Sequence, residues 1–193
     1  MFRELKNATF KKTEVAKDTL SKKEEKKMPV FVKATIWIFV AVLYVLQVSP
    51  LFFRYRNGCT DTVVPVIGFA ISVLGLLLET LADKQKSAQK KERPDMVAMK
   101  GLYKIVRCPN YLGEITFWTG VFVAGITAYQ TVGQWIMAIV AYIAIVFIMF
   151  NGAQRLEKRQ MKRYGDNKEY RAYADKTPII LPLIPLYHLN KKG

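Results

Sequence analysis

Long uncharged apolar runs alternate with strongly charged stretches along this chain. Residues 34–53 carry no charged side chain, and residues 62–82 carry only Glu79. About 20 residues rising 1.5 Å each match the roughly 30 Å hydrocarbon core of a bilayer, so each run predicts one spanning helix. Residues 115–153 are uncharged over twice that length, and the polar, glycine-containing stretch 125–134 predicts a turn between two helices. The pattern predicts an all-α polytopic membrane protein with four transmembrane helices.

Lysine and arginine are distributed very unequally between the predicted loops. Of the 30 cations, two lie in the loop at 54–61 and none lies in the turn at 126–134. The others lie in residues 1–33, 84–107 and 155–193. Cytoplasmic loops carry the excess of lysine and arginine in membrane proteins. Both termini and the middle loop are therefore predicted to be cytoplasmic.

These boundaries divide the chain into a basic cytoplasmic N-terminal tail (1–33), a four-helix membrane domain with cytoplasmic loops (34–186) and a C-terminal tail (187–193). Residues 1–28 lack the apolar core of a cleavable signal peptide. They are expected to form a tail or a weak amphipathic helix on anionic lipid. The expected location is a multi-pass position in the cytoplasmic membrane of a bacterium or the endoplasmic reticulum of a eukaryote.

The net charge of +15 would suggest nucleic acid as the partner of a soluble domain. Here the charges are separated from the apolar runs, so the expected partner is the membrane and no nucleic acid is expected. Cys59 and Cys108 fall on opposite sides of the predicted membrane and are expected to be free thiols. With His188 as the single histidine and no cysteine–histidine cluster, no metal site is predicted.

Candidate chemistry begins at the end of the second apolar run. Glu79, Asp83, Lys86 and Lys90 are spaced four, three and four residues apart, so they share one face if the helix continues out of the membrane. Such a stripe could hold a ligand with hydroxyls at one end and phosphate at the other. The alternative is a ladder of ion pairs with snorkelling lysines, although an acid at membrane depth usually faces a cavity.

Two further polar blocks lie on the predicted cytoplasmic side. The first block comprises Arg107, Asn110, Tyr111 and Glu114; Pro109 predicts a bend at Cys108, and the helix start that follows is a fair anion site. The second block contains Glu157, Tyr164, Tyr170 and Tyr173 among many cations. These cations are either the positive-inside signal alone or a site in which tyrosines stack a flat base and arginines hold phosphate.

Taken together, the blocks resemble the C-terminal domain of the steroid 5-alpha-reductase family, most closely its bacterial-type, mostly uncharacterised membrane branch. The resemblance covers residues 62–186, and the matching blocks are Asp83-Lys-Gln-Lys, Gly101-Leu-Tyr, Arg107-x-Pro-Asn-Tyr-x-Gly-Glu114, Leu156-Glu-Lys-Arg, Tyr164-Gly-Asp, Tyr170-x-x-Tyr173 and Thr177-Pro. It implies an NADPH site at the cytoplasmic helix ends and hydride transfer to a conjugated C=C bond of a lipid in the bilayer, such as an enone steroid or isoprenoid.

The resemblance also implies roles for individual residues. Arg107 and Lys90 would bind phosphates, and Asn110 and Glu114 would bind the nicotinamide or ribose end. No catalytic residue is assigned. The full set of candidate cofactor contacts is Glu79, Asp83, Lys86, Lys90, Arg107, Asn110, Tyr111, Glu114, Glu157, Tyr170 and Tyr173.

A related membrane fold supplies the alternative. Isoprenylcysteine and phospholipid methyltransferases share an Arg-His-Pro-x-Tyr block and a late glutamate, and they bind S-adenosylmethionine; they usually show Glu-Glu where this chain has Leu156-Glu157. The chain departs from the reductases at Cys108, where they have histidine, and in having one helix before the matched region. A homo-oligomer or another chain would have to complete the substrate pocket, and a non-catalytic scaffold of the same fold is the third alternative.

Overall fold

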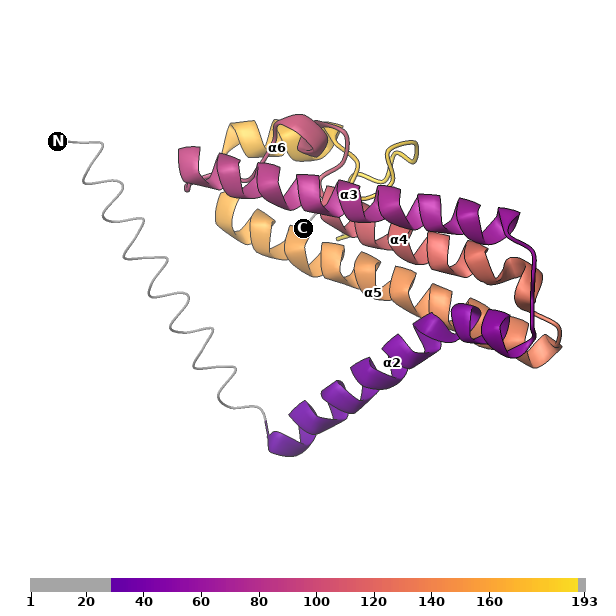
Figure 1. The fold of residues 1–193 in the computed structure, drawn as a ribbon. Coiled ribbons are helices and arrows are strands. Elements are labelled where there is room, and N and C mark those ends of the chain that lie inside the picture. Colours follow the sequence, from indigo (N-terminus) through magenta and orange to yellow (C-terminus); the bar gives the residue numbers. More distant parts are fainter. Residues whose placement is uncertain (1–28, 191–193) are drawn as a thin grey trace. The chain divides into compact units, whose positions relative to one another are not determined.

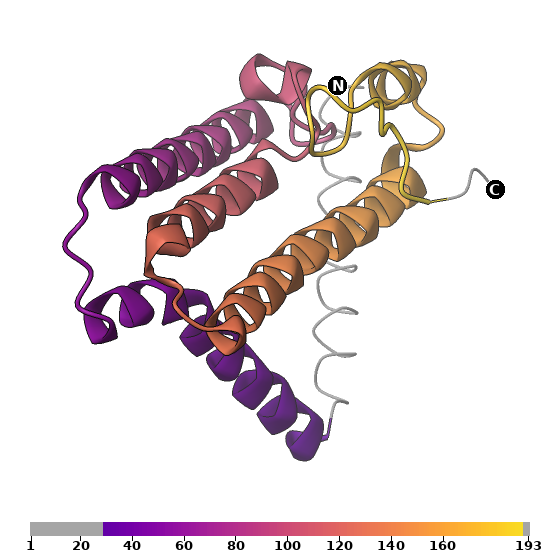
Figure 2. The ribbon, with the colours of Figure 1, turned by 90° about the vertical axis from the view of Figure 1, so that its right-hand side faces the viewer.

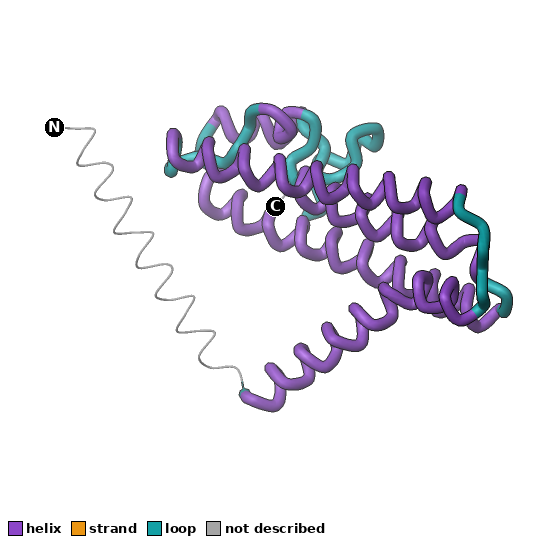
Figure 3. Tube along the Cα trace, in the orientation of Figure 1, coloured by secondary structure: helices purple, strands orange, loops and turns teal. Residues whose placement is uncertain are grey.

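The computed structural model describes residues 29–190, and every regular element in that part of the chain is a helix (Figure 3). The tail or surface helix expected at residues 1–28 lies outside the described residues. The helices are α2 (Val30–Arg56), α3 (Val63–Glu92), α4 (Pro109–Gly125), α5 (Val132–Tyr164) and α6 (Lys168–Lys176), with short 3-10 helices η1 (Gly101–Lys104) and η2 (Ile126–Ala128). The all-α prediction is confirmed over the described range.

Three helices, α2, α3 and α5, are long and apolar enough to cross a bilayer, with stretches of mean hydropathy from 2.1 to 2.3. Only 28%, 17% and 22% of the residues in those stretches are buried, so most of their apolar side chains face outward. An apolar surface of that extent is unfavourable in water and ordinary in lipid. The chain is a multi-pass integral membrane protein.

The uncharged stretch 115–153 does form two helices, as predicted, but they differ in length. α4 has 17 residues, or about 26 Å of helix, which falls short of a hydrocarbon core of roughly 30 Å. The connection is shorter than predicted, because α5 already begins at Val132 and takes in Gly133 and Gln134. Length and composition therefore identify three candidate spans, and a fourth span stays a prediction, as does the side of each terminus.

The chain divides within α2 into two compact units, residues 1–42 and residues 43–193. In the described part of the first unit, α2 exposes large apolar side chains, among them Phe31, Trp37 and Phe39. The Thr35 hydroxyl donates to the Phe31 carbonyl at 2.9 Å. This bond satisfies the hydroxyl inside its own helix, which suits a lipid environment.

In the second unit, α3 and α4 lie side by side because glycines line the seam between them (Figures 1 and 2). Gly75 lies against Gly113, and Gly68 lies against Gly120 further along the seam; a Cβ at any of the four would collide with the opposite backbone. Ser72 of α3 donates to a backbone carbonyl of α4 at 3.0 Å. Close backbone contact of this kind associates helices in lipid, where burial of apolar surface supplies little drive.

At one end of the second unit, the last turns of α2 meet the connection between α4 and α5 (Figure 2). Asn57 Nδ2 donates to the Ala128 carbonyl at 2.7 Å, and Gln47 Nε2 donates to the Ala141 carbonyl at 2.8 Å. Thr131 caps the start of α5 by accepting from the backbone N–H of Gln134. These polar bonds hold the uncharged loop together.

The opposite end carries α6 and residues 177–190, which we term the C-terminal segment (Figure 1). The backbone N–H groups of Arg107 and Cys108 donate to the carbonyls of Pro178 and Ile179, both at 2.8 Å. These bonds bring the segment that precedes α4 against a part of the chain 71 residues later in the sequence. The polar blocks of the sequence are thereby gathered at one end of the bundle.

Candidate functional site

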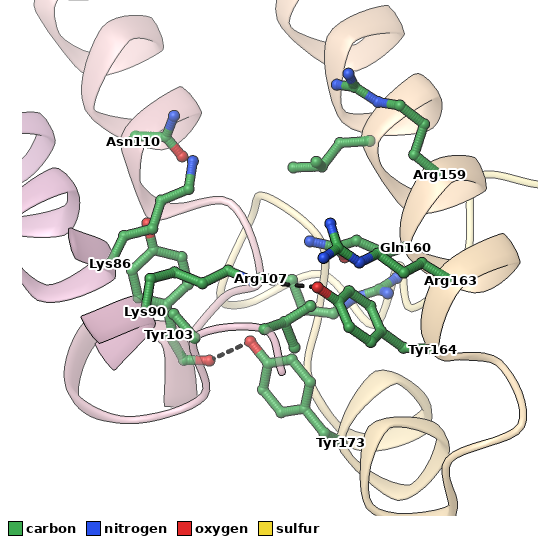
Figure 4. A pocket seen from close by; sticks show the side chains of 13 residues that line it. Lys86, Lys90, Tyr103, Arg107, Asn110, Arg159, Gln160, Arg163, Tyr164 and Tyr173 are labelled. Carbon is green, nitrogen blue, oxygen red and sulfur yellow. Dashed lines mark hydrogen bonds between the residues drawn. The ribbon is translucent and has the colours of Figure 1, made fainter. Parts of the chain in front are cut away.

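A cavity of about 280 Å³ lies at this end, between the last turns of α3 and α5 (Figure 4). Its lining contains five cations, three tyrosines and no carboxylate. The lining residues are Lys86, Lys90, Val97, Ala98, Tyr103, Arg107, Asn110, Leu156, Arg159, Gln160, Arg163, Tyr164 and Tyr173. Such a lining favours an anionic ligand with a flat, stackable part.

The α3 side of the cavity is built by a helix that continues beyond its apolar run to Glu92, which meets the condition for a shared face. Lys86 and Lys90 are four residues apart and project from the same face (Figure 4). Lys90 Nζ donates to the Tyr164 hydroxyl at 3.1 Å, which ties α3 to α5. Within residues 29–190, Lys86 makes neither an ion pair nor a side-chain hydrogen bond, so its ammonium is available to a ligand.

Arg107 is the buried cation of the cavity, with 4% of its surface exposed. Its Nη2 donates to Glu157 Oε1 at 2.8 Å and to the Tyr187 carbonyl. Its Nε and Nη1 have no hydrogen-bond partner among the described residues. A buried donor without a partner costs about 1–3 kcal/mol. Arg107 lines the cavity, so these two unsatisfied donors belong to a residue beside the space that a ligand would occupy.

The start of α4 supplies a further anion-binding element. Pro109 occupies the first turn and Cys108 precedes it without a side-chain cap, which confirms the predicted bend and leaves backbone N–H groups available. The Asn110 side chain lies beside Lys86 at the cavity (Figure 4). Burial raises the pKa of the Cys108 thiol to about 12, so this thiol is uncharged at neutral pH. The steroid 5-alpha-reductase family, which the sequence resembles, has histidine at this position.

Two tyrosines close the cavity near η1 and α6. The Tyr173 hydroxyl donates to the Tyr103 carbonyl at 2.7 Å (Figure 4), while the Tyr103 hydroxyl has no partner among the described residues. Burial raises the pKa of both phenols, so both stay protonated at neutral pH. The Tyr103 O–H is thus a neutral, buried donor in the wall of the cavity.

The α5 side of the cavity was largely missed from the sequence. Arg159, Gln160, Arg163 and Tyr164 line the cavity (Figure 4) but are absent from the predicted contacts. The Arg163 guanidinium lies 5.2 Å from the centre of the Tyr164 ring, in cation–π range. A helical spacing of four, then three residues from Leu156 through Gln160 to Arg163 is the signal that could have found this face.

Glu157 does not line the cavity and is 4% exposed beneath Arg107. Its Oε1 pairs with Arg107 and with His188 Nδ1, the latter at 3.0 Å. Its Oε2 accepts from the backbone N–H groups of Leu189 and Asn190 at 2.9 and 3.1 Å. Glu157 therefore anchors the C-terminal segment and Arg107 together, and His188 belongs to this anchor.

The structure brings five of the eleven predicted contacts together in the cavity: Lys86, Lys90, Arg107, Asn110 and Tyr173. Glu79 and Asp83 line a separate open depression along α3. Tyr111 lines a groove beside α5, and Glu114 is half-buried and lines none of these hollows. Tyr170 is fully buried, with its ring 5.9 Å from that of Tyr164.

The fold and the site define a class: a multi-pass membrane protein with a cation-lined cavity at one end of its helices. The chain belongs to the family described as protein of unknown function (DUF1295), whose model matches residues 10–177. No curated protein and no solved structure matches it.

Proposed function

We propose that this protein is a membrane-embedded, NADPH-dependent reductase of a C=C bond in a lipid, an enone of steroid or isoprenoid type. The observation that carries the proposal is the cavity itself, which is lined by five cations, buried Arg107 among them, and by no carboxylate. The resemblance of the sequence blocks to the steroid 5-alpha-reductase family supplies the reaction type.

The residues present fit the cofactor. Arg107 and Lys90 would hold phosphates, and Asn110 with the first turn of α4 would hold the nicotinamide or ribose end. Tyr164 and Tyr173 offer flat faces beside these cations. When bound, NADPH supplies a hydride. The chain's own part is to bind and orient that cofactor at the membrane end of the cavity.

The lining argues against the methyltransferase alternative. S-adenosylmethionine carries a positive sulfonium and an ammonium group, which the five cations of the lining would repel. The cavity offers cations and tyrosines but no carboxylate, and Glu157, the late glutamate of that comparison, is already paired with Arg107 and His188. The charge of the lining therefore favours the dinucleotide.

The packing within residues 43–193 supports a return crossing by α4, and the distribution of lysine and arginine supports a cytoplasmic position for both termini. Lys90 Nζ, near the end of α3, lies 3.1 Å from the Tyr164 hydroxyl, near the end of α5. Both helices therefore finish at the same end of the bundle. The chain between them must return across the membrane before α5 begins. α4 and η2 together provide about 32 Å for that return, which is enough for a fourth crossing.

Binding measurements on the purified full-length chain in neutral detergent test the proposal. Calorimetric titration with NADPH, NADH and S-adenosylmethionine should give binding of NADPH. The double variant K86Q/K90Q should weaken that binding about tenfold or more, because each lost charge-assisted hydrogen bond contributes about 1.5–3 kcal/mol. The variant K84Q/K91Q removes the same charge from another face of α3, outside the cavity, and should bind NADPH like the wild type.

Each other outcome has a definite meaning. Binding of S-adenosylmethionine alone would replace the reductase by the methyltransferase, and binding of none of the three would leave the non-catalytic scaffold. NADPH binding that K86Q/K90Q and K84Q/K91Q weaken equally would place the cofactor outside this cavity.

A further inference from the structure

A second, open groove of about 590 Å³ lies along the charged part of α5. We call it the α5 groove, and it is lined by Tyr111, Gly152, Arg155, Lys158, Arg159 and Lys162. Only Arg159 is shared with the cation-lined cavity described above. The α5 groove is therefore a neighbouring feature that the proposed cofactor site does not use.

The α5 groove begins where the apolar surface of α5 stops. Residues 132–153 of this helix contain no charged side chain, and their 22 residues span about 33 Å, the thickness of the hydrocarbon core. Arg155 is the first charge after this run. The cations of the groove therefore lie at the level of the lipid headgroups.

The four cations share one face of the helix. Arg155, Lys158, Arg159 and Lys162 occupy relative positions 0, 3, 4 and 7, which lie above one another over two helical turns. All four are exposed, and none forms an ion pair with an acid within residues 29–190. They present about 10 Å of uncompensated positive charge along the helix axis.

The inner end of the groove is shaped by Tyr111 and Gly152. A Cβ at Gly152 would come within 3.4 Å of the Tyr111 ring, so a larger side chain there would fill the space between α4 and α5. A tyrosine at this depth offers an apolar ring and a polar hydroxyl, as interfacial aromatic residues do. The groove thus has an amphipathic inner end next to the acyl region and a cationic outer part.

We propose that the α5 groove binds the headgroup of an anionic phospholipid from the adjoining leaflet. The cations match its phosphate in charge and in depth, and a lipid can reach an open groove on the outer face of α5 laterally from the bilayer. This proposal does not depend on the reductase assignment. The cofactor cavity holds a buried arginine with unpartnered donors, whereas the α5 groove offers exposed cations only.

The test compares phosphatidylglycerol with phosphatidylcholine on the full-length chain. Purified protein in neutral detergent is mixed with equal amounts of the two dioleoyl lipids, and native mass spectrometry counts the lipid retained. Each Lys or Arg near an anionic lipid surface contributes about fivefold in binding. The wild type should prefer phosphatidylglycerol by about tenfold or more, and the triple variant R155Q/K158Q/K162Q should lose this preference. Arg159 is kept so that the cofactor cavity stays intact.

A matched control removes the same charge elsewhere at this end of the protein. Lys104, Lys168 and Lys176 are exposed and do not line the α5 groove or the cation-lined cavity. The variant K104Q/K168Q/K176Q should keep the wild-type preference. An equal loss in both triple variants would show that net charge, rather than the groove, selects the lipid.

A salt series on the wild type gives a second, mutation-free result. Raising NaCl from about 0.1 to 0.5 M should reduce the preference several-fold, because exposed charges are screened. Equal retention of the two lipids, or a preference that salt leaves unchanged, would overturn the proposal.

Discussion

Arg107 depends on a carboxylate 50 residues later in the chain. Glu157 Oε1 accepts a hydrogen bond from Arg107 Nη2 at 2.8 Å, and both residues are about 4% exposed. Replacement of Glu157 by alanine leaves a buried charge uncompensated and removes the acceptor that holds Leu189 and Asn190. We expect Glu157→Ala to destabilise the protein by about 3–5 kcal/mol, measured as a fall in the thermal unfolding midpoint in detergent.

An exposed pair of the same composition provides the control. Arg93 and Glu169 form a two-bond ion pair, but about half of each side chain is exposed. Solvent-exposed pairs of this kind contribute little, so Glu169→Ala should shift the midpoint only slightly. A similar fall in both variants would mean that Glu157 is not the anchor described here.

These residues also mark the limit of what the sequence could predict. Lys86, Lys90 and Asn110 were found because helical spacing and a proline-marked helix start are local signals. Glu157 was chosen from the Leu156-Glu-Lys-Arg block, and a sequence block does not reveal whether a carboxylate faces a cavity or a buried arginine. His188 was missed because its contact with Glu157 depends on the path of the C-terminal segment.

At the scale of helices, the seam between α3 and α4 is the most sharply defined packing. Alanine normally replaces glycine inside a helix with a gain of about 0.5–1 kcal/mol. At Gly75 the added Cβ would collide with the α4 backbone at Phe117 and Gly113. We expect Gly75→Ala to destabilise the bundle by about 1–3 kcal/mol, measured by thermal unfolding in detergent.

Gly133 in the first turn of α5 is the matched control, since only the Thr131 hydroxyl lies as near as 4.0 Å to its added Cβ. Gly133→Ala should leave the unfolding midpoint unchanged or raise it. If Gly75→Ala were equally harmless, the close approach of the two helices would be wrong.

The helices themselves were largely predictable, since the three long apolar runs of this chain have few alternatives to spanning helices. Which helices touch was not. The glycines at 68, 75, 113 and 120 are visible in the sequence, yet nothing local pairs the first two with the last two. The length of α4 was also missed, because an uncharged run of 39 residues does not show where its helices begin and end.

For the whole molecule, the orientation of the helices decides which compartment the cavity faces. Cys59 lies in the loop between α2 and α3, at the end opposite the cavity, and is partly exposed. Cys108 is buried, and burial raises the pKa of its thiol, so it should not react while the protein is folded. The two native cysteines therefore form a built-in topology probe.

A membrane-impermeant maleimide should label intact cells at Cys59, and Cys59→Ser should abolish this signal. Adding Lys104→Cys, at the cavity end of the helices, to Cys59→Ser should give label only after permeabilisation if the cavity faces the cytoplasm. Labelling of the Lys104→Cys variant in intact cells, with Cys59 protected in the wild type, would reverse the orientation and place the cation-lined cavity outside the cell, away from the cytoplasmic NADPH pool that the proposed reaction needs.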